Sequence, residues 1–574
     1  MSKGNVVNVN YIDSALNDLH DKRDSDSDNH IKTPFLTNED NYEDLRTRTT
    51  SGNEFIENGI GNLQEKVNNN NNTSRVRSSE SSRYSNEFDE PLRKHSSLID
   101  PIEAEKWLNP YHNVNIAIFA SYLSVGFGLY FLQTPLTFYM VDSLNATPGQ
   151  QTVINGLMYL PWALKIFCGI LTDSFPIFGY RRKSYFLLGW GLYVACNILL
   201  AIIRTPNIAQ LAALIFLQTL AFVQADVCTD ASIVERSKLY ENNENRGTLQ
   251  ATGYIIRYFG GIIGAMLGAV LYNKDSWGWG LPISVIFVIN GAVPMCLVLP
   301  FVYSFVEFPA TELPQVKKQL YAIWQLVQRR AIWQPCAFIY IYNIFVLTNP
   351  AWNSFLVDGL GFSNFFLGLL TVGAAVLSYS ALVIYKKYLF NVSWRYIYLG
   401  GTALSSLFSI LQLILVFRWN VSWGISSPGW NLVFAMGTYG MVQFVQSIQF
   451  LPCCRMFLIM CPGGAEGASY AMLTTLSNLA GTVAYSIAAA VANIWNVEND
   501  TLLNHDYSGM WRLTVFCACI QLTGLIFLGL IPNGVDEQLA LQSNNEKSLI
   551  GGTVFLTTVG LSLVFVMVIT FITV

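Results

Sequence analysis

The sequence predicts an all-α membrane protein with two six-helix halves and one further C-terminal span. Its 574 residues are 52% apolar and only 13% charged, which is too apolar for an ordinary soluble protein. From residue 114 onward, apolar runs of about 20 or more residues recur, each long enough to cross ~30 Å of hydrocarbon. Six such runs, a polar stretch and six more runs suggest the two halves.

The chain divides into a polar tail, two halves, a linker and a terminal segment. Residues 1–105 are rich in Asn, Ser and Asp, so we expect a disordered cytosolic tail. The halves are predicted at 106–306 and 333–531, with a cytosolic linker at 307–332 and a terminal segment at 532–574. The expected spans are 114–141, 151–172, 184–203, 207–234, 249–272, 281–306, 333–356, 363–385, 396–417, 428–452, 465–495, 511–531 and 549–574.

Basic residues predict the orientation of these spans. Arg181, Arg182 and Lys183 follow the second span, and a cationic loop stays on the cytosolic side of a membrane. With this loop inside, most of the other Lys and Arg residues that flank spans also fall inside. The basic residues that fall outside are few: Arg204, Lys274, Arg418 and Arg512.

The last apolar run is predicted to be a thirteenth span. It carries no charge, and it lacks the polar face that a helix lying on a membrane surface needs. Twelve spans return the chain to the cytosol, so a thirteenth crossing places Val574 outside. Because the run lies beyond both halves, we expect it to be peripheral to them.

Ionisable side chains inside spans are functional candidates because their placement in a membrane is costly. Asp226 and Asp230 share one face of the fourth span, while Lys165 lies in the second and Arg257 in the fifth. At ~1.5 Å per residue, Lys165, Asp226 and Arg257 lie at similar depths. Three interpretations remain open: a fixed ion-pair cluster, a carboxylate (Asp226 in first place) that exchanges a proton or partner, or contact with substrate only.

Three stretches resemble the folate–biopterin transporter family of the major facilitator superfamily. They are 160–185, LPWALKIFCGILTDSFPIFGYRRKSY; 225–235, ADVCTDASIVE; and 462–479, PGGAEGASYAMLTTLSNL. The resemblance runs from about 107 to 531. An internal repeat agrees with it, since Gly247 opens the fifth span and Gly467 opens the eleventh, 220 residues later. Two six-helix halves related by a parallel repeat are typical of the major facilitator fold.

The resemblance implies a secondary active transporter that carries folates or pterins by alternating access, together with protons. Other members carry different metabolites such as S-adenosylmethionine, so the substrate stays open. It also implies a cytosolic gate, in which the loop aspartate, here Asp173, helps to bridge the halves. The start of the eleventh span favours a nearby anion through its helix dipole. The predicted gate residues are Asp173, Arg181, Arg182, Lys183, Glu235, Arg246, Arg455 and Glu466.

The C-terminal half offers aromatic and amide side chains in place of charges. Such side chains suit a flat heteroaromatic ligand with hydrogen-bonding edges, although Gln and Asn also join neighbouring helices. The candidate substrate contacts are Trp352, Asn353, Gln446, Tyr470 and Asn478, with Gln443 and Gln449 beside them.

Several classes of protein are disfavoured. The chain has no P-loop, nucleophile elbow or metal-ligand spacing, so we expect no enzyme, no cofactor and no bound metal. The expected partners are a small-molecule substrate (a folate or pterin), protons and the lipid bilayer, with no nucleic acid, and the expected state is a monomer. A non-transporting membrane receptor and a lipid scramblase remain alternatives, and the resident membrane, plasma or organelle, stays open.

Overall fold

The computed structural model describes residues 101–144, 148–273, 278–307, 316–425, 427–461, 466–495, 497 and 499–573. Contacts divide the chain into two units, Met1–Ser78 and Ser79–Val574, and every described residue belongs to the second. The disordered tail predicted for 1–105 therefore lies outside the described residues, apart from its last five. Those five residues open helix α2 (Pro101–Leu108).

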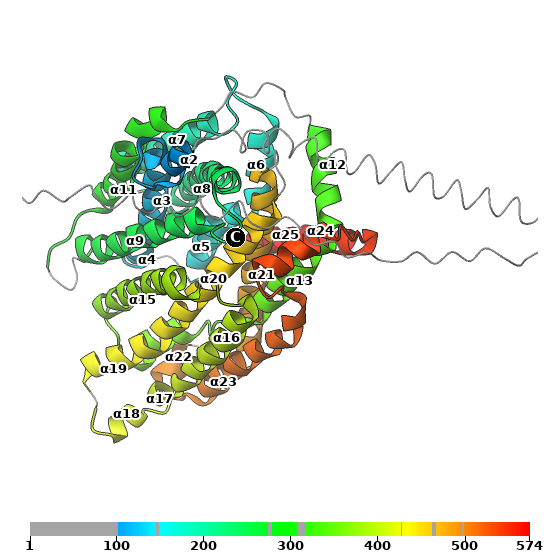
Figure 1. Cartoon of the computed structure of the whole chain (residues 1–574). Coiled ribbons are helices and arrows are strands. Elements are labelled where there is room, and N and C mark those ends of the chain that lie inside the picture. The colour runs from blue at the N-terminus through cyan, green and yellow to red at the C-terminus, as the bar shows by residue number, and fades with distance from the viewer. Residues whose placement is uncertain are drawn as a thin grey trace, which may run out of the picture. The chain divides into compact units, whose positions relative to one another are not determined.

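The N-terminal half is a set of long helices (Figure 1). The longest, α8, begins with a capping box. The Asn207 side chain accepts the Gln210 backbone N–H, and the Gln210 side chain accepts the Asn207 backbone N–H. The helices are α3 (Asn113–Phe131), α4 (Gln133–Phe138), α5 (Pro148–Ala163), α6 (Lys165–Ser174), α7 (Lys183–Ile203), α8 (Ile208–Tyr240), α9 (Thr248–Leu271) and α11 (Ile283–Leu297), with a 3₁₀ turn at Leu299–Ser304.

The C-terminal half follows the amphipathic helix α12 (Val316–Val327). Its main helices are α13 (Arg330–Phe345), α14 (Trp352–Ser354), α15 (Asn364–Ile384), α16 (Trp394–Leu411), α17 (Leu413–Val416), α18 (Trp419–Ser422), α19 (Pro428–Ala435), α20 (Met441–Met460), α21 (Glu466–Ala492), α22 (Asn499–Leu503) and α23 (Ser508–Thr523). The π-helical segment η5 (Met436–Gly440) joins α19 to α20, and the 3₁₀ segment η6 (Gly524–Leu530) follows α23. Two helices end the chain, α24 (Val535–Ser543) and α25 (Leu549–Thr573).

Eleven helices of the described part are long and apolar enough to cross a membrane. Among the thirteen expected spans, the second and the seventh are not in this set. The second is divided at Leu164 into α5 and α6, three residues after Pro161, which has no N–H to donate to the preceding turn. The seventh ends as a helix at Phe345, before Asn349 and Pro350. α25 is in the set, as predicted.

Two contacts between the halves position the site. α21 packs on α6 and α8, and α15 packs on α9. Within the N-terminal half, α3 and α9 approach so closely that a Cβ at Gly126 would lie 1.6 Å from the Arg257 carbonyl oxygen. This backbone contact needs glycine, and it holds the part of α9 that carries Arg257 against α3.

Candidate functional site

The break in the second span is completed by side chains of the other half. The Ile166 backbone N–H, which follows the break at Leu164, donates to Thr475 Oγ1 of α21 at 3.1 Å. On the other side of the break, Asn478 Nδ2 donates to the Trp162 carbonyl oxygen at 3.4 Å. A backbone group without a partner is costly inside a membrane, so α21 stabilises the interruption that places Lys165 in the protein interior.

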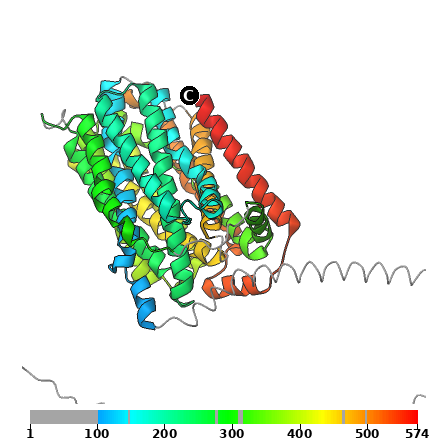
Figure 2. The same cartoon turned by 90° about the horizontal axis from the view of Figure 1, so that it is seen from above.

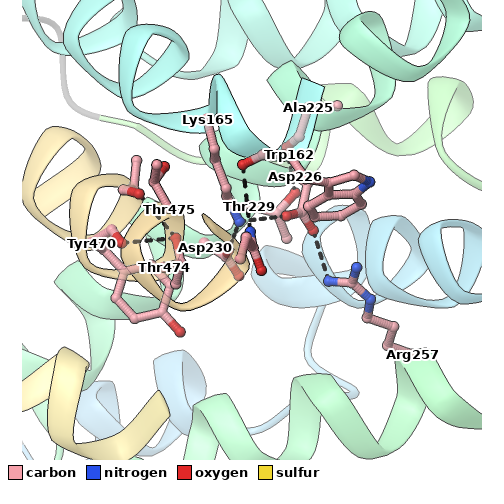
Figure 3. Close-up of polar contacts among 12 residues, drawn as sticks. Trp162, Lys165, Ala225, Asp226, Thr229, Asp230, Arg257, Tyr470, Thr474 and Thr475 are labelled. Carbon is pink, nitrogen blue, oxygen red and sulfur yellow. Dashed lines mark hydrogen bonds and ion pairs between the residues drawn. The ribbon is translucent and has the colours of Figure 1, made fainter. Parts of the chain in front are cut away.

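The four predicted charged residues form one buried cluster (Figure 3). Lys165 Nζ lies 2.7 Å from Asp226 Oδ2 and 2.6 Å from Asp230 Oδ2. Arg257 Nη1 lies 3.0 Å from Asp226 Oδ1. Lys165 and both carboxylates are almost fully buried, whereas the Arg257 side chain keeps 11% of its surface exposed. Two positive and two negative charges thus cancel within hydrogen-bonding distance.

Two aromatic residues that were not among the predicted site residues support this cluster. Tyr122 Oη donates to Asp230 Oδ1 at 2.7 Å. The Trp162 ring lies 5.6 Å from Lys165 Nζ and 5.3 Å from the Arg257 guanidinium carbon, within the range of cation–π attraction. Trp162 lies in the first of the three family-like stretches, but no sequence signal separated Tyr122 from the many other Tyr residues of the spans.

A hydrogen-bond chain leads from the cluster to α21 of the other half. Gln250 Nε2 donates to Tyr470 Oη at 3.2 Å and lies 3.5 Å from Tyr122 Oη, which in turn binds Asp230. Tyr254 Oη lies 3.5 Å from Tyr470 Oη. The structure thus places Tyr470 and Asn478 in contacts between the halves. Their role as substrate contacts stays a prediction.

Near the basic loop, the carboxylate of Asp173 binds the start of α21. Asp173 Oδ2 accepts the Ala468 N–H at 2.7 Å, and a Cβ at Gly467 would lie 2.8 Å from Asp173 Oδ1. The first turn of a helix has free N–H groups and a positive dipole end, so it attracts a buried carboxylate. Glycine at position 467 allows the carboxylate to approach this closely.

Arg182 joins three helices at the same end of the bundle. It forms ion pairs with Glu235 of α8 and with Glu466 of α21, the latter at 3.3 Å. Its backbone N–H donates to Glu307, as do those of Arg181 (2.9 Å) and Lys183 (2.8 Å). Glu307 was assigned only to the polar linker by the sequence, yet it caps the turn that presents Arg182.

A second contact at this end joins α20 to the loop between α8 and α9. Arg455 Nε donates to the Arg246 carbonyl oxygen and Nη2 to the Glu244 carbonyl oxygen, each at 2.8 Å. Arg246 thus contributes its backbone to this contact. Glu241, which the sequence did not indicate, accepts the N–H groups of Gly247 (2.7 Å) and Leu249 (2.6 Å) and so caps α9.

Some of the amide and aromatic candidates of the C-terminal half line a cavity. Trp352, Gln443 and Gln446 contribute to it. Trp352 Nε1 is buried and has no hydrogen-bond partner among the described residues. Asn353 is exposed and does not line the cavity. Gln449 is buried, where it accepts a hydrogen bond from the Tyr342 hydroxyl and donates one to the Tyr398 carbonyl oxygen. The other lining residues are uncharged too: Val346, Leu347, Thr348, Asn349, Ser409, Gln412, Tyr439, Val442, Thr514, Cys517 and Gln521.

Comparison with known proteins identifies the family. The model of the BT1 family matches residues 125–549, well over half of the chain. The chain belongs to the BT1 family. The family resemblance predicted from the three sequence stretches is thus confirmed, and so is a multi-pass membrane protein of the transporter class. α25 begins where the match ends.

Relatives of this BT1-family chain include the folate-biopterin transporter of Synechocystis, 28% identical over 73% of this chain and 83% of the relative. A probable folate-biopterin transporter 2 of Arabidopsis thaliana is 24% identical over 72% and 83%, respectively. Folate transporter 1 of Plasmodium falciparum is 22% identical over 72% and 78%. Among solved structures, the proton:xylose symporter XylE superposes with a TM-score of 0.53 at 13% identity, covering 76% of this chain and 98% of XylE. This likeness confirms the major facilitator fold.

Proposed function

We propose that this BT1-family protein moves folates or pterins across a membrane by alternating access, coupled to protons. The observation that carries the proposal is the neutral cluster of Lys165, Asp226, Asp230 and Arg257. It is buried between spans and connected by hydrogen bonds to α21 of the other half. Relatives described as folate-biopterin or folate transporters support the substrate class.

The cluster offers a simple physical basis for coupling. Asp226 holds both Lys165 and Arg257, so a proton on its carboxylate removes one negative charge from a set that sums to zero. The cluster then carries one excess positive charge, which is costly to bury unless an anion joins it. Folates bring carboxylates, and the partly exposed Arg257 guanidinium is the group that would meet one. Proton and anionic substrate then enter together.

The cavity in the C-terminal half suits the other end of such a substrate. Its lining is uncharged, and it combines amide groups from Gln443 and Gln446 with the indole of Trp352, whose buried N–H has no partner among the described residues. A pteridine ring has an edge of hydrogen-bond donors and acceptors and flat apolar faces, which match these groups. Among the predicted substrate contacts, we therefore favour Trp352 and Gln446.

The contacts at the basic end are proposed to form the cytosolic gate. Asp173 and Arg182 tie α6 and α7 to α21, and Arg455 ties α20 to the α8–α9 loop. With these contacts made, the path between the halves is closed at that end. Alternating access requires that they break and re-form once in each cycle.

Uptake by proteoliposomes that contain the purified full chain tests the proposal. Labelled folate, biopterin and S-adenosylmethionine are supplied in turn, with and without an imposed pH gradient. We expect uptake of a folate or a pterin that an inward proton gradient accelerates. Uptake of S-adenosylmethionine alone supports the other transporter hypothesis. Lipid scrambling without uptake of any of the three contradicts the proposal and favours a scramblase.

A further inference from the structure

The terminal helix α25 is anchored to the C-terminal half at the basic end of the bundle. Just before it, Glu546 forms an ion pair with Arg330 at 2.7 Å, and the Ser548 N–H donates to the Gln328 carbonyl oxygen at 2.8 Å. Further along, Ser562 Oγ lies 2.6 Å from Tyr340 Oη of α13. α24, which precedes it, adds a bond from Gln538 to the Ala331 carbonyl oxygen at 2.8 Å.

From this anchor α25 extends along one side of the bundle and reaches the other half (Figure 2). It packs on α12, α13 and α21, and also on α5 of the N-terminal half. Phe555, Val559 and Val566, at helical spacing on one face, are buried in the same apolar cluster as Leu160 of α5. The opposite face carries exposed aliphatic residues such as Leu561 and Val564, as a lipid-facing surface does.

Away from the basic loop, side chains on the facing sides of α5 and α21 are exposed. Asn478 of α21 faces α5, because it binds the Trp162 carbonyl oxygen. Tyr485 lies seven residues further along α21, hence on the same face, yet 57% of its surface is exposed. Tyr159 of α5 precedes Trp162 by almost one turn and is 64% exposed. Two helices that touch near Trp162 therefore diverge toward the end of the bundle away from the basic loop.

Where α5 and α21 diverge, the path between the halves would open sideways into the lipid. We propose that α25 is the lateral wall of this path: it covers the seam between α5 and α21, held to the C-terminal half by polar contacts and packed on α5 through apolar side chains. An anchor on one half with apolar packing on the other lets the halves move while the seam stays covered. The inference goes beyond the proposed function, because it holds whatever the substrate is.

Spin-label accessibility tests the wall without any transport measurement. A nitroxide is attached at Tyr485→Cys in a chain whose exposed cysteines, Cys296 and Cys519, are replaced by serine. Collisions with oxygen, which concentrates in lipid, are compared with collisions with a water-soluble nickel chelate. A chain that ends at Ser548 keeps the Glu546 anchor and loses α25. We expect a several-fold rise in the oxygen-to-nickel collision ratio on truncation, and an unchanged ratio overturns the proposal.

A matched pair of labels in the full-length chain covers the case in which the truncated chain does not fold. Val559→Cys lies on the buried face of α25 and Val564→Cys on the exposed face, since the native side chains are 5% and 59% exposed. We expect oxygen collisions to be several-fold more frequent at position 564 than at position 559. Equal collision rates at the two positions mean that α25 does not pack on the seam, which also overturns the proposal.

Discussion

Each charged group of the central cluster forms an ion pair, but the number of ion pairs differs from group to group. Asp226 binds both Lys165 and Arg257, while Asp230 binds Lys165 and the Tyr122 hydroxyl. Removal of Asp226 therefore leaves Arg257 without an ion-pair partner in the described structure. Removal of Asp230 leaves every cation with one carboxylate. Of the two carboxylates, Asp226 is thus the one on which the balance of charge depends more.

Asp226→Asn and Arg257→Gln should each abolish transport while the protein still inserts into the membrane. Either change strands a charge in a site of low dielectric, at a cost of roughly 3–5 kcal/mol in comparable buried pairs. Uptake and surface labelling of both variants check this. The double variant restores neutrality, so it should recover the thermal stability lost in the single variants but not the uptake. Wild-type uptake in either single variant would contradict a role in coupling.

Trp352→Phe should weaken substrate binding without unfolding the protein. Phenylalanine keeps most of the apolar ring and loses an N–H that has no partner in the described structure. If the substrate accepts a hydrogen bond there, KM rises roughly two- to tenfold, which is the worth of one such bond at about 0.5–1.5 kcal/mol. Gln449→Leu is the matched control, because Gln449 bonds within the fold and its loss should lower stability first. An unchanged KM in Trp352→Phe removes this residue from the substrate site.

Most helices were predicted from the sequence, but the interruptions within the spans were not. The expected third span, 184–203, corresponds to α7 at Lys183–Ile203 because an uncharged apolar run bounded by basic residues has few alternative structures in a membrane. The break at Leu164 was not predicted. Proline is tolerated inside membrane helices, so Pro161 alone did not indicate it. Its partners, Thr475 and Asn478, are some 300 residues away, and only the tertiary structure brings them there.

The gate and the cavity could likewise be predicted only in part, because many of their contacts are formed by the tertiary structure. Opposite charges in neighbouring spans allowed Lys165, Asp226 and Arg257 to be predicted together, since few other groups neutralise a charge in lipid. Arg182 and Glu466 were recognised through the family resemblance. Glu307 and Glu241 act on backbone N–H groups, and such contacts leave no pattern in the sequence. Asn353 and Gln446 are both polar span residues in the sequence, and only packing separates the exposed one from the one that lines the cavity.

Arg182→Gln should slow turnover and leave substrate preference unchanged. Its ion pairs with Glu235 and Glu466 join α7, α8 and α21 at the basic end, well away from the cavity lined by Trp352. Loss of the guanidinium charge weakens closure at that end and shifts the conformational equilibrium. The ratio of folate to biopterin uptake, measured beside the maximal rate of each, checks both parts. Arg181→Gln and Lys183→Gln serve as comparisons, and a changed ratio in Arg182→Gln would show that the loop acts on selectivity.

The direction of α25 determines on which side of the membrane Val574 lies. α25 begins beside Gln328 and Arg330, at the same end as the basic loop, and runs along the bundle (Figure 2). An epitope placed after Val574 should therefore be labelled from the non-cytosolic side in intact cells or organelles. A second epitope before Pro101 serves as the cytosolic control. Labelling of both epitopes only after the cytosolic side is exposed would show that α25 does not cross.

The interruption of the second span has one more consequence, for the exchange of amide protons with solvent. The Ile166 N–H is protected by Thr475, which belongs to the opposite half. In the proposed alternating-access cycle the halves separate at the basic end, so this amide would lose its partner and meet water, while the amides within α8 would keep theirs. Deuterium uptake at Ile166 should therefore follow the fraction of time that the basic end is open. A substrate that favours the form closed at the basic end should slow deuterium uptake at Ile166 and leave that of α8 unchanged. The exchange of a single backbone amide would then report how often the basic end opens.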